Sequence, residues 1–146
     1  MKLDDDIREY LPEVPDFGRP ITIRHLLTHT SGLPRFWCHY YGDDLATRPT
    51  TRELVRRYGA LVAPPGERFI YSNVGIAVAS LVIEEVSGKS YEEFMQAEVF
   101  EPLGLTRTAI VTAPYGDPGI AQKYDRGKRL PFSDMGIRAA GSVWAS

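Results

Sequence analysis

The chain has 146 residues, close to the ~150 residues that serve as a prior for a single domain. Its 17 Lys and Arg against 19 Asp and Glu give a formal net charge of −2, which argues against a general nucleic-acid binder because such domains are normally basic. Hydrophobic residues at 43% and charged residues at 25% are typical of a globular chain and exclude a disordered one.

Two short helices are predicted in the first third of the chain. The first covers residues 3–11, where apolar side chains recur on one helix face: Leu3, Ile7, Tyr10 and Leu11. The second begins at its N-cap Thr22 and runs through Thr28, and Gly32 is predicted to be the left-handed residue that ends it. A loop rich in aromatic residues follows over residues 34–49.

Two capping boxes predict helix starts further along the chain. In a capping box a Ser or Thr side chain and the side chain of a Glu three residues later each accept a hydrogen bond from the other's backbone N–H. Thr50 with Glu53 and Ser90 with Glu93 fit this pattern, and apolar residues at helical spacing follow each pair.

The strongest predicted helix spans residues 73–87, with Ser72 or Asn73 as its N-cap. Its side chains are apolar on almost every face, which predicts burial on all sides. Short strands are predicted over Ala109 to Thr112 and Gln122 to Leu130. Helix dominates the first 105 residues, so the predicted fold class is mainly α.

Metal and membrane sites are not expected. A single cysteine, Cys38, excludes a thiolate zinc cluster, and no apolar run reaches the ~18 residues of a membrane span. His25 and His29 could share one helix face as metal ligands, but Leu26 stands where the zinc-protease pattern needs Glu. The favoured alternative is that both histidines make local hydrogen bonds near a helix end. We expect no metal and no cofactor.

The motifs of nucleophilic catalysis are incomplete. The sequence contains no G-x-S-x-G, no S-x-x-K, no Lys-Thr-Gly and no His-x-Gly. What remains is Tyr71-Ser72-Asn73, which stands between the rigid turn Pro64-Pro65-Gly66 and the buried helix. Short polar side chains and backbone N–H groups are exposed at such a helix start, and a positioned tyrosine can transfer protons. On chemistry alone, a packed Tyr71 and a capping Asn73 are the favoured alternative.

Four phrases stand out when they are taken together: Leu3 to Pro12, Ile21 to Pro34 with its His-Thr-Ser-Gly-Leu core, Pro65 to Asn73, and Phe100 to Leu105. In this order and spacing they resemble the serine β-lactamase-related family. That family contains class C β-lactamases, penicillin-binding-protein-like D,D-peptidases, D-amino-acid peptidases and family VIII carboxylesterases. The resemblance extends to Ala139-Ala140-Gly141-Ser142 and so covers nearly the whole chain.

The resemblance implies a two-lobed enzyme in which an α/β sandwich and a mostly helical lobe enclose the site. In the family, the serine of an S-x-x-K element attacks a carbonyl carbon and forms an acyl-enzyme. By resemblance, Tyr71 assists as general base and acid, Asn73 orients the lysine and contacts the substrate amide, and Ser72 is a spacer. By resemblance, the substrate-facing segment runs from Leu33, the last residue of the His-Thr-Ser-Gly-Leu phrase, to Tyr41. The expected substrate-binding residues in it are Leu33, Pro34, Phe36 and Trp37.

The family's S-x-x-K element lies ahead of the Leu-Asp-Asp phrase, and its third element, Lys-Thr-Gly or His-x-Gly, lies beyond Gly141. We therefore expect residues 1–146 to be an internal portion of a longer domain, mainly the helical lobe of the α/β serine β-lactamase/penicillin-binding-protein-like fold. The expected substrate is a small molecule or short peptide, and the chain alone is expected to be inactive. The alternative is a non-catalytic helical binding module from the same family, with the loop Phe36–Tyr41 as its ligand surface.

Overall fold

The computed structural model describes residues 1–35, 49–58, 60–110, 124–130 and 137–145. Its α-helices are α1 (Ile23–Leu27), α2 (Thr51–Tyr58), α3 (Asn73–Ser87) and α4 (Tyr91–Met95). Short 3-10 turns lie at Ile7–Glu9 and Arg138–Ala140, and a π-helical turn, Gln96–Phe100, continues α4. The strands are β1 (Ala109–Ile110), β2 (Tyr124–Asp125), β3 (Lys128–Arg129) and β4 (Val143–Trp144).

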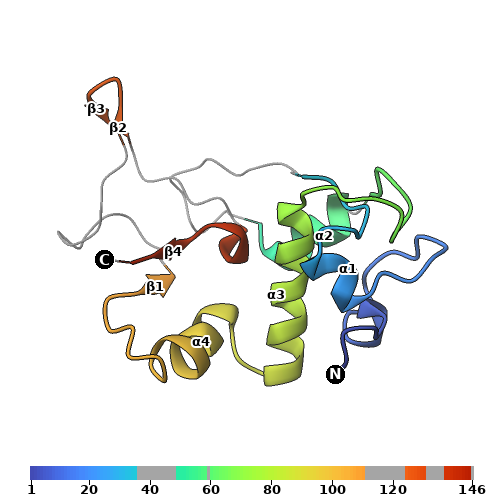
Figure 1. Cartoon of the computed structure of the whole chain (residues 1–146), viewed down its shortest axis with the longest axis horizontal. Coiled ribbons are helices and arrows are strands. Elements are labelled where there is room, and N and C mark those ends of the chain that lie inside the picture. The colour runs from blue at the N-terminus through green and yellow to red at the C-terminus, as the bar shows by residue number, and fades with distance from the viewer. Residues whose placement is uncertain (36–48, 59, 111–123, 131–136, 146) are drawn as a thin grey trace.

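Helix α3 is the centre of the described structure (Figure 1). It contacts α1, α2, α4 and the turn Arg138–Ala140, and its first ten residues supply much of the hydrophobic core. The core is formed by buried aliphatic side chains: Ile7, Leu11, Val14, Ile21, Ile23, Leu26, Leu33, Val55, Val74, Val78, Leu81 and Val82. Burial does not extend round the whole helix as predicted, because Ile76, Ala79 and Ile83 are only partly buried and Val86 in the last turn is 52% exposed.

The predicted helix over residues 3–11 is wrong in extent. Only Ile7–Glu9 form a helical turn, of the 3-10 type, and Asp6 caps it by accepting the N–H of Arg8. Asp6 itself is extended and pairs with Thr22 in an isolated antiparallel bridge, while the N–H of Ile7 donates to the carbonyl of Ile21 at 2.9 Å. The segment before Ile7 therefore bonds to a distant part of the chain instead of to its own next turn.

The predictions that rest on capping chemistry are confirmed. Thr22 caps α1, Ser90 and Glu93 form a reciprocal box at the start of α4, and Thr50 and Glu53 exchange the same pair of bonds at the start of α2. Helix α3 has the predicted bounds, and Gly88 ends it in the left-handed conformation with φ 68°. The capping bonds at the helix starts join residues three apart, so they need no tertiary partner.

The predicted ending of α1 needs a correction. The helix ends at Leu27, and the left-handed residue next to it is His29, with φ 56°. Gly32 is left-handed too, with φ 75°, but it lies in the loop that follows. A Cβ atom there would lie 2.0 Å from the backbone carbonyl oxygen of Ala63, so close packing of two chain segments requires glycine at this position.

The predicted strands are confirmed where they fall within the described residues. β1 pairs antiparallel with β4, with Ala109 opposite Trp144. β2 and β3 form a hairpin, and its two turn residues, Arg126 and Gly127, both have positive φ, as a type I′ turn requires. The hairpin projects from the rest of the fold (Figure 1). In the part of the chain that the structure describes, no helix has the length and apolar composition of a membrane span.

Candidate active site at the start of helix α3

The N-terminus of α3 is organised by Ser72. Ser72 is the N-cap, with φ −134° and ψ 106°, and its Oγ accepts the N–H of Gly75 at 2.8 Å. The same hydroxyl donates to the carbonyl oxygen of Pro34 at 2.8 Å. The side chain is fully buried. Of the two cap candidates in the sequence, the structure therefore selects Ser72, which leaves the side chain of Asn73 outside the capping bond.

Pro34 and Arg35, which directly follow the His-Thr-Ser-Gly-Leu phrase, are hydrogen-bonded to this helix start. Besides the bond from Ser72 to Pro34, the backbone N–H of Asn73 donates to the carbonyl oxygen of Arg35 at 3.1 Å. Asn73 is 8% exposed. The fold thus brings together the two segments, residues 33–35 and 71–73, that the sequence singled out separately.

Tyr71 lies just before the cap and is 46% exposed, so its ring is partly open to solvent. The guanidinium carbon of Arg35 lies 5.5 Å from the centre of the Tyr71 ring, within the range of a cation–π contact. The imidazole of His29 lies against the same ring, with centroids 4.6 Å apart and planes tilted by 40°. A phenol held in this way by two neighbouring side chains, yet open on part of its surface, is suited to meet a substrate.

His29 also contacts the backbone on both sides of Tyr71. The N–H of Ile70 donates to the His29 carbonyl oxygen at 2.7 Å, and the N–H of Ser72 donates to His29 Nδ1 at 3.2 Å. The sequence interpretation gave both histidines local hydrogen bonds. This is confirmed for His25, whose Nδ1 accepts the N–H of Thr22 at 3.3 Å, but it is wrong for His29, whose partner is 43 residues away.

The four expected substrate-binding residues differ in their burial, and the structure describes only two of them. The Leu33 side chain is 2% exposed and belongs to the hydrophobic core. Pro34 is partly buried and contributes its carbonyl to the α3 cap. Phe36 and Trp37 lie outside the described residues. Arg35 lies within the expected substrate-facing segment but was not among its named residues, and no sequence pattern indicated its contact with Tyr71.

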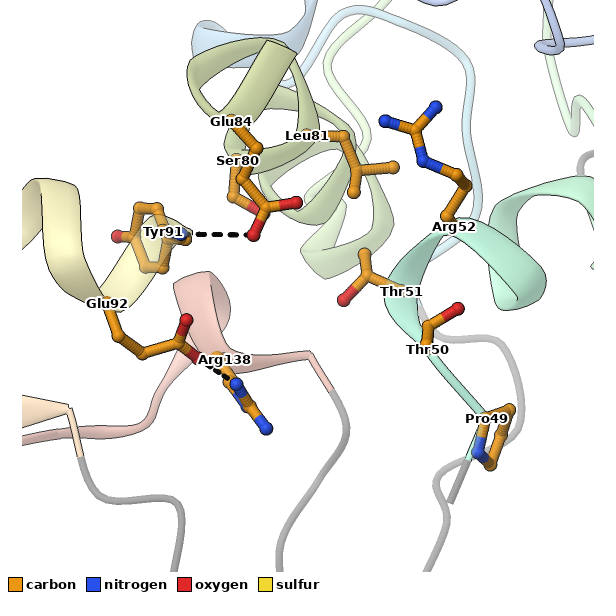
Figure 2. Close-up of a pocket in the computed structure, with 10 residues that line it drawn as sticks. All are labelled: Pro49, Thr50, Thr51, Arg52, Ser80, Leu81, Glu84, Tyr91, Glu92 and Arg138. Atoms are coloured by element: carbon orange, nitrogen blue, oxygen red, sulfur yellow. Dashed lines mark hydrogen bonds and ion pairs between the residues drawn. The ribbon is translucent and has the colours of Figure 1, made fainter. Parts of the chain in front are cut away.

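A separate cavity of 460 Å³ lies beside the middle of α3 (Figure 2). It is lined by residues of α2, α3, α4 and the turn before β4: Pro49, Thr50, Thr51, Arg52, Ser80, Leu81, Glu84, Tyr91, Glu92 and Arg138. Arg138 pairs with Glu92, and Glu84 accepts the backbone N–H of Tyr91 at 3.0 Å. Tyr71 and Asn73, the expected catalytic residues, do not line this cavity.

Comparison with known proteins identifies the family. The family model described as Beta-lactamase matches residues 1–146. The chain belongs to the beta-lactamase family. The resemblance found in the four sequence phrases is thereby confirmed, and the family's relatives are serine hydrolases.

Three relatives illustrate the match to the beta-lactamase family. The D-alanyl-D-alanine-carboxypeptidase/endopeptidase AmpH of Escherichia coli (strain K12) is 34% identical over 157 residues, covering 100% of this chain and 37% of that protein. The octameric penicillin-binding protein homologue from Pyrococcus abyssi superposes with a TM-score of 0.72 at 31% identity, covering 100% of this chain and 36% of that one. A class C beta-lactamase mutant superposes with a TM-score of 0.79 at 19% identity, covering 100% and 40%, which shows a shared fold. The chain spans little more than a third of each relative's length.

Proposed function

We propose that residues 1–146 are an internal portion of a beta-lactamase-family serine hydrolase, and that they contribute Tyr71 and Asn73 to its active site. The reaction is hydrolysis of an ester, an amide or a β-lactam through an acyl-enzyme. The nucleophilic serine and its lysine, in an S-x-x-K element, come from residues outside this stretch. A third element, Lys-Thr-Gly or His-x-Gly, also comes from residues outside this stretch and completes the site.

In this proposal Tyr71 moves the proton. Tyr71 acts together with the lysine of the S-x-x-K element, which takes the phenol proton. The phenolate oxygen then accepts the proton of the nucleophilic serine as the serine oxygen bonds to the carbonyl carbon, and gives that proton to the leaving nitrogen or oxygen as the bond from that atom to carbon breaks. Water then attacks the acyl-enzyme, and Tyr71 passes a water proton back to the serine oxygen. Asn73 orients the lysine and contacts the substrate amide.

The observation that carries the proposal is the placement of Tyr71. Tyr71 is 46% exposed directly before the N-cap of α3, and its ring contacts His29 and Arg35, in a chain that matches the family along its whole length. Ser72 is buried and committed to two hydrogen bonds, which argues against Ser72 as a nucleophile. We place the substrate along the loop that begins at Pro34 and includes Phe36 and Trp37.

The test uses the protein encoded by the complete reading frame that contains this chain. Hydrolysis of nitrocefin, p-nitrophenyl butyrate and a D-Ala-D-Ala peptide is measured for wild type and for Tyr71→Phe. We expect kcat to fall by about 10²- to 10⁴-fold, the usual contribution of a positioned acid or base. The Tm should change little, because phenylalanine keeps the ring contact with His29. Tyr124→Phe is the matched control, since Tyr124 is also exposed but lies on the distant β2–β3 hairpin.

Two results would contradict the proposal. One is a Tyr71→Phe protein with the turnover of wild type. The other is a wild-type protein that hydrolyses none of the three substrates and is not labelled by a fluorophosphonate. The second result would favour the alternative, a non-catalytic helical binding module of the same family.

A further inference from the structure

The residues before and after Tyr71 each donate a backbone N–H to the same residue, His29. The N–H of Ile70 donates to the main-chain carbonyl of His29 at 2.7 Å, and the N–H of Ser72 donates to the imidazole Nδ1 of the same histidine at 3.2 Å. Each bond by itself would fix one peptide plane. Together they hold the Phe69–Ile70 peptide and the Tyr71–Ser72 peptide, and so restrict the direction in which the Tyr71 side chain leaves the chain.

The imidazole ring adds a contact with the Tyr71 side chain. Its centroid lies 4.6 Å from that of the phenol ring, and it meets Phe69 edge-on at 5.7 Å. Aromatic rings at these separations attract one another beyond the area they bury. The phenol ring is therefore supported on one side while almost half of the residue stays exposed.

His29 is itself held in an unusual conformation. Its φ of 56° lies in the left-handed region, which is uncommon for residues other than glycine. The turn at the end of α1 maintains it, since the N–H of His29 donates to the Leu26 carbonyl and the N–H of Thr30 donates to the His25 carbonyl. Because Nδ1 accepts a hydrogen bond, a neutral imidazole carries its proton on Nε2.

We propose that His29 is a positioning residue for Tyr71, acting through its carbonyl and its Nδ1 acceptor. This inference rests on the proposed function of Tyr71 as the proton-transfer group. Proton transfer requires the phenol oxygen within hydrogen-bond reach of the reacting atoms, and a displacement of ~1 Å costs about 10²-fold in rate. Loss of the His29 side chain should therefore lower kcat and leave KM nearly unchanged.

The test compares three substitutions in the protein from the complete reading frame, with p-nitrophenyl butyrate as substrate. His29→Gly removes the ring and the acceptor but keeps the left-handed backbone. His29→Asn places an amide oxygen near the position of Nδ1 and also tolerates the left-handed conformation. His25→Ala is the matched control, because the Nδ1 of His25 also accepts a backbone N–H, from Thr22, at a site away from Tyr71.

We expect kcat to fall about 10²-fold in His29→Gly, to recover to within about threefold of wild type in His29→Asn, and to stay within about threefold in His25→Ala. If His29→Gly does not fold, His29→Asn alone decides. In that case a His29→Asn protein with the kcat of wild type supports the proposal. A folded His29→Asn protein that is as slow as Tyr71→Phe overturns it. A folded His29→Gly protein with wild-type kcat also overturns it, provided that Tyr71→Phe is slow. If Tyr71→Phe itself keeps wild-type kcat, the proposed function has failed first.

Discussion

Replacing Ser72 with alanine tests whether this serine is a helix cap or a nucleophile. The substitution removes a hydroxyl that accepts the N–H of Gly75 and donates to the carbonyl of Pro34, both at 2.8 Å. The residue is fully buried, so water cannot replace either partner without a rearrangement. The consequences should therefore appear in the free energy of unfolding.

The magnitude follows from the two bonds. Loss of a serine N-cap costs about 0.5–2 kcal/mol, and loss of a neutral hydrogen bond costs about 0.5–1.5 kcal/mol. Together they predict a loss of roughly 1–3.5 kcal/mol in the free energy of unfolding. The shift in Tm per kcal/mol is about 2–4 °C at about 150–250 residues and smaller for longer proteins, so Tm in the complete protein should fall by a few degrees. Turnover of the folded protein should stay within about threefold of wild type, because Ser72 makes no proton transfer in the proposed mechanism.

The assay is thermal unfolding together with steady-state hydrolysis of p-nitrophenyl butyrate by the protein from the complete reading frame. Ser80→Ala is the matched control: Ser80 is also buried in α3, but its hydroxyl donates only to the Ala77 carbonyl one turn earlier. We expect its Tm to change by less than that of Ser72→Ala. If Ser72→Ala abolished acylation and left Tm unchanged, Ser72 would be the nucleophile and the assigned roles would be wrong.

Two further predictions concern stability. Gly32→Ala should lower the free energy of unfolding by roughly 3 kcal/mol or more, because it combines a left-handed backbone with a clash against the Ala63 carbonyl. Gly18→Ala is the control: its φ of 73° is left-handed too, but the added Cβ lies in open space, so the loss should be about 1–2 kcal/mol. Equal losses for the two variants in urea unfolding would refute this. The Arg8 side chain donates hydrogen bonds to the Asp6 carboxylate and so lowers the pKa of Asp6. The ionised carboxylate therefore stabilises the folded state at pH values above the ordinary aspartate pKa. This stabilisation is lost as the pH falls through the lowered pKa. Asp6→Asn should therefore flatten the acid limb of the stability–pH curve, and an unchanged slope would contradict the reasoning.

The helix starts and the family were determined by the sequence itself. The bonds at Thr22, Thr50 and Ser90 join residues no more than three apart, and their strength depends on side-chain chemistry that can be read from adjacent letters. The end of α3 at Gly88 also depends on local chemistry, because glycine adopts the left-handed conformation readily and its N–H bonds Glu84 in the preceding turn. The order and spacing of the four family phrases likewise needed no coordinates, and the family match over residues 1–146 confirms them.

Only the tertiary structure decided what surrounds Tyr71. The bond between His29 and Ser72 spans 43 residues, and the close approach of Gly32 to Ala63 joins two loops, so neither is specified by a local pattern. The helix predicted over residues 3–11 does not form along its whole length for the same reason: Asp6 pairs with Thr22, which lies 16 residues further along the chain, and not with its own neighbours in a helix. A short segment has few local hydrogen bonds to gain, and distant partners with buried apolar area then determine its conformation.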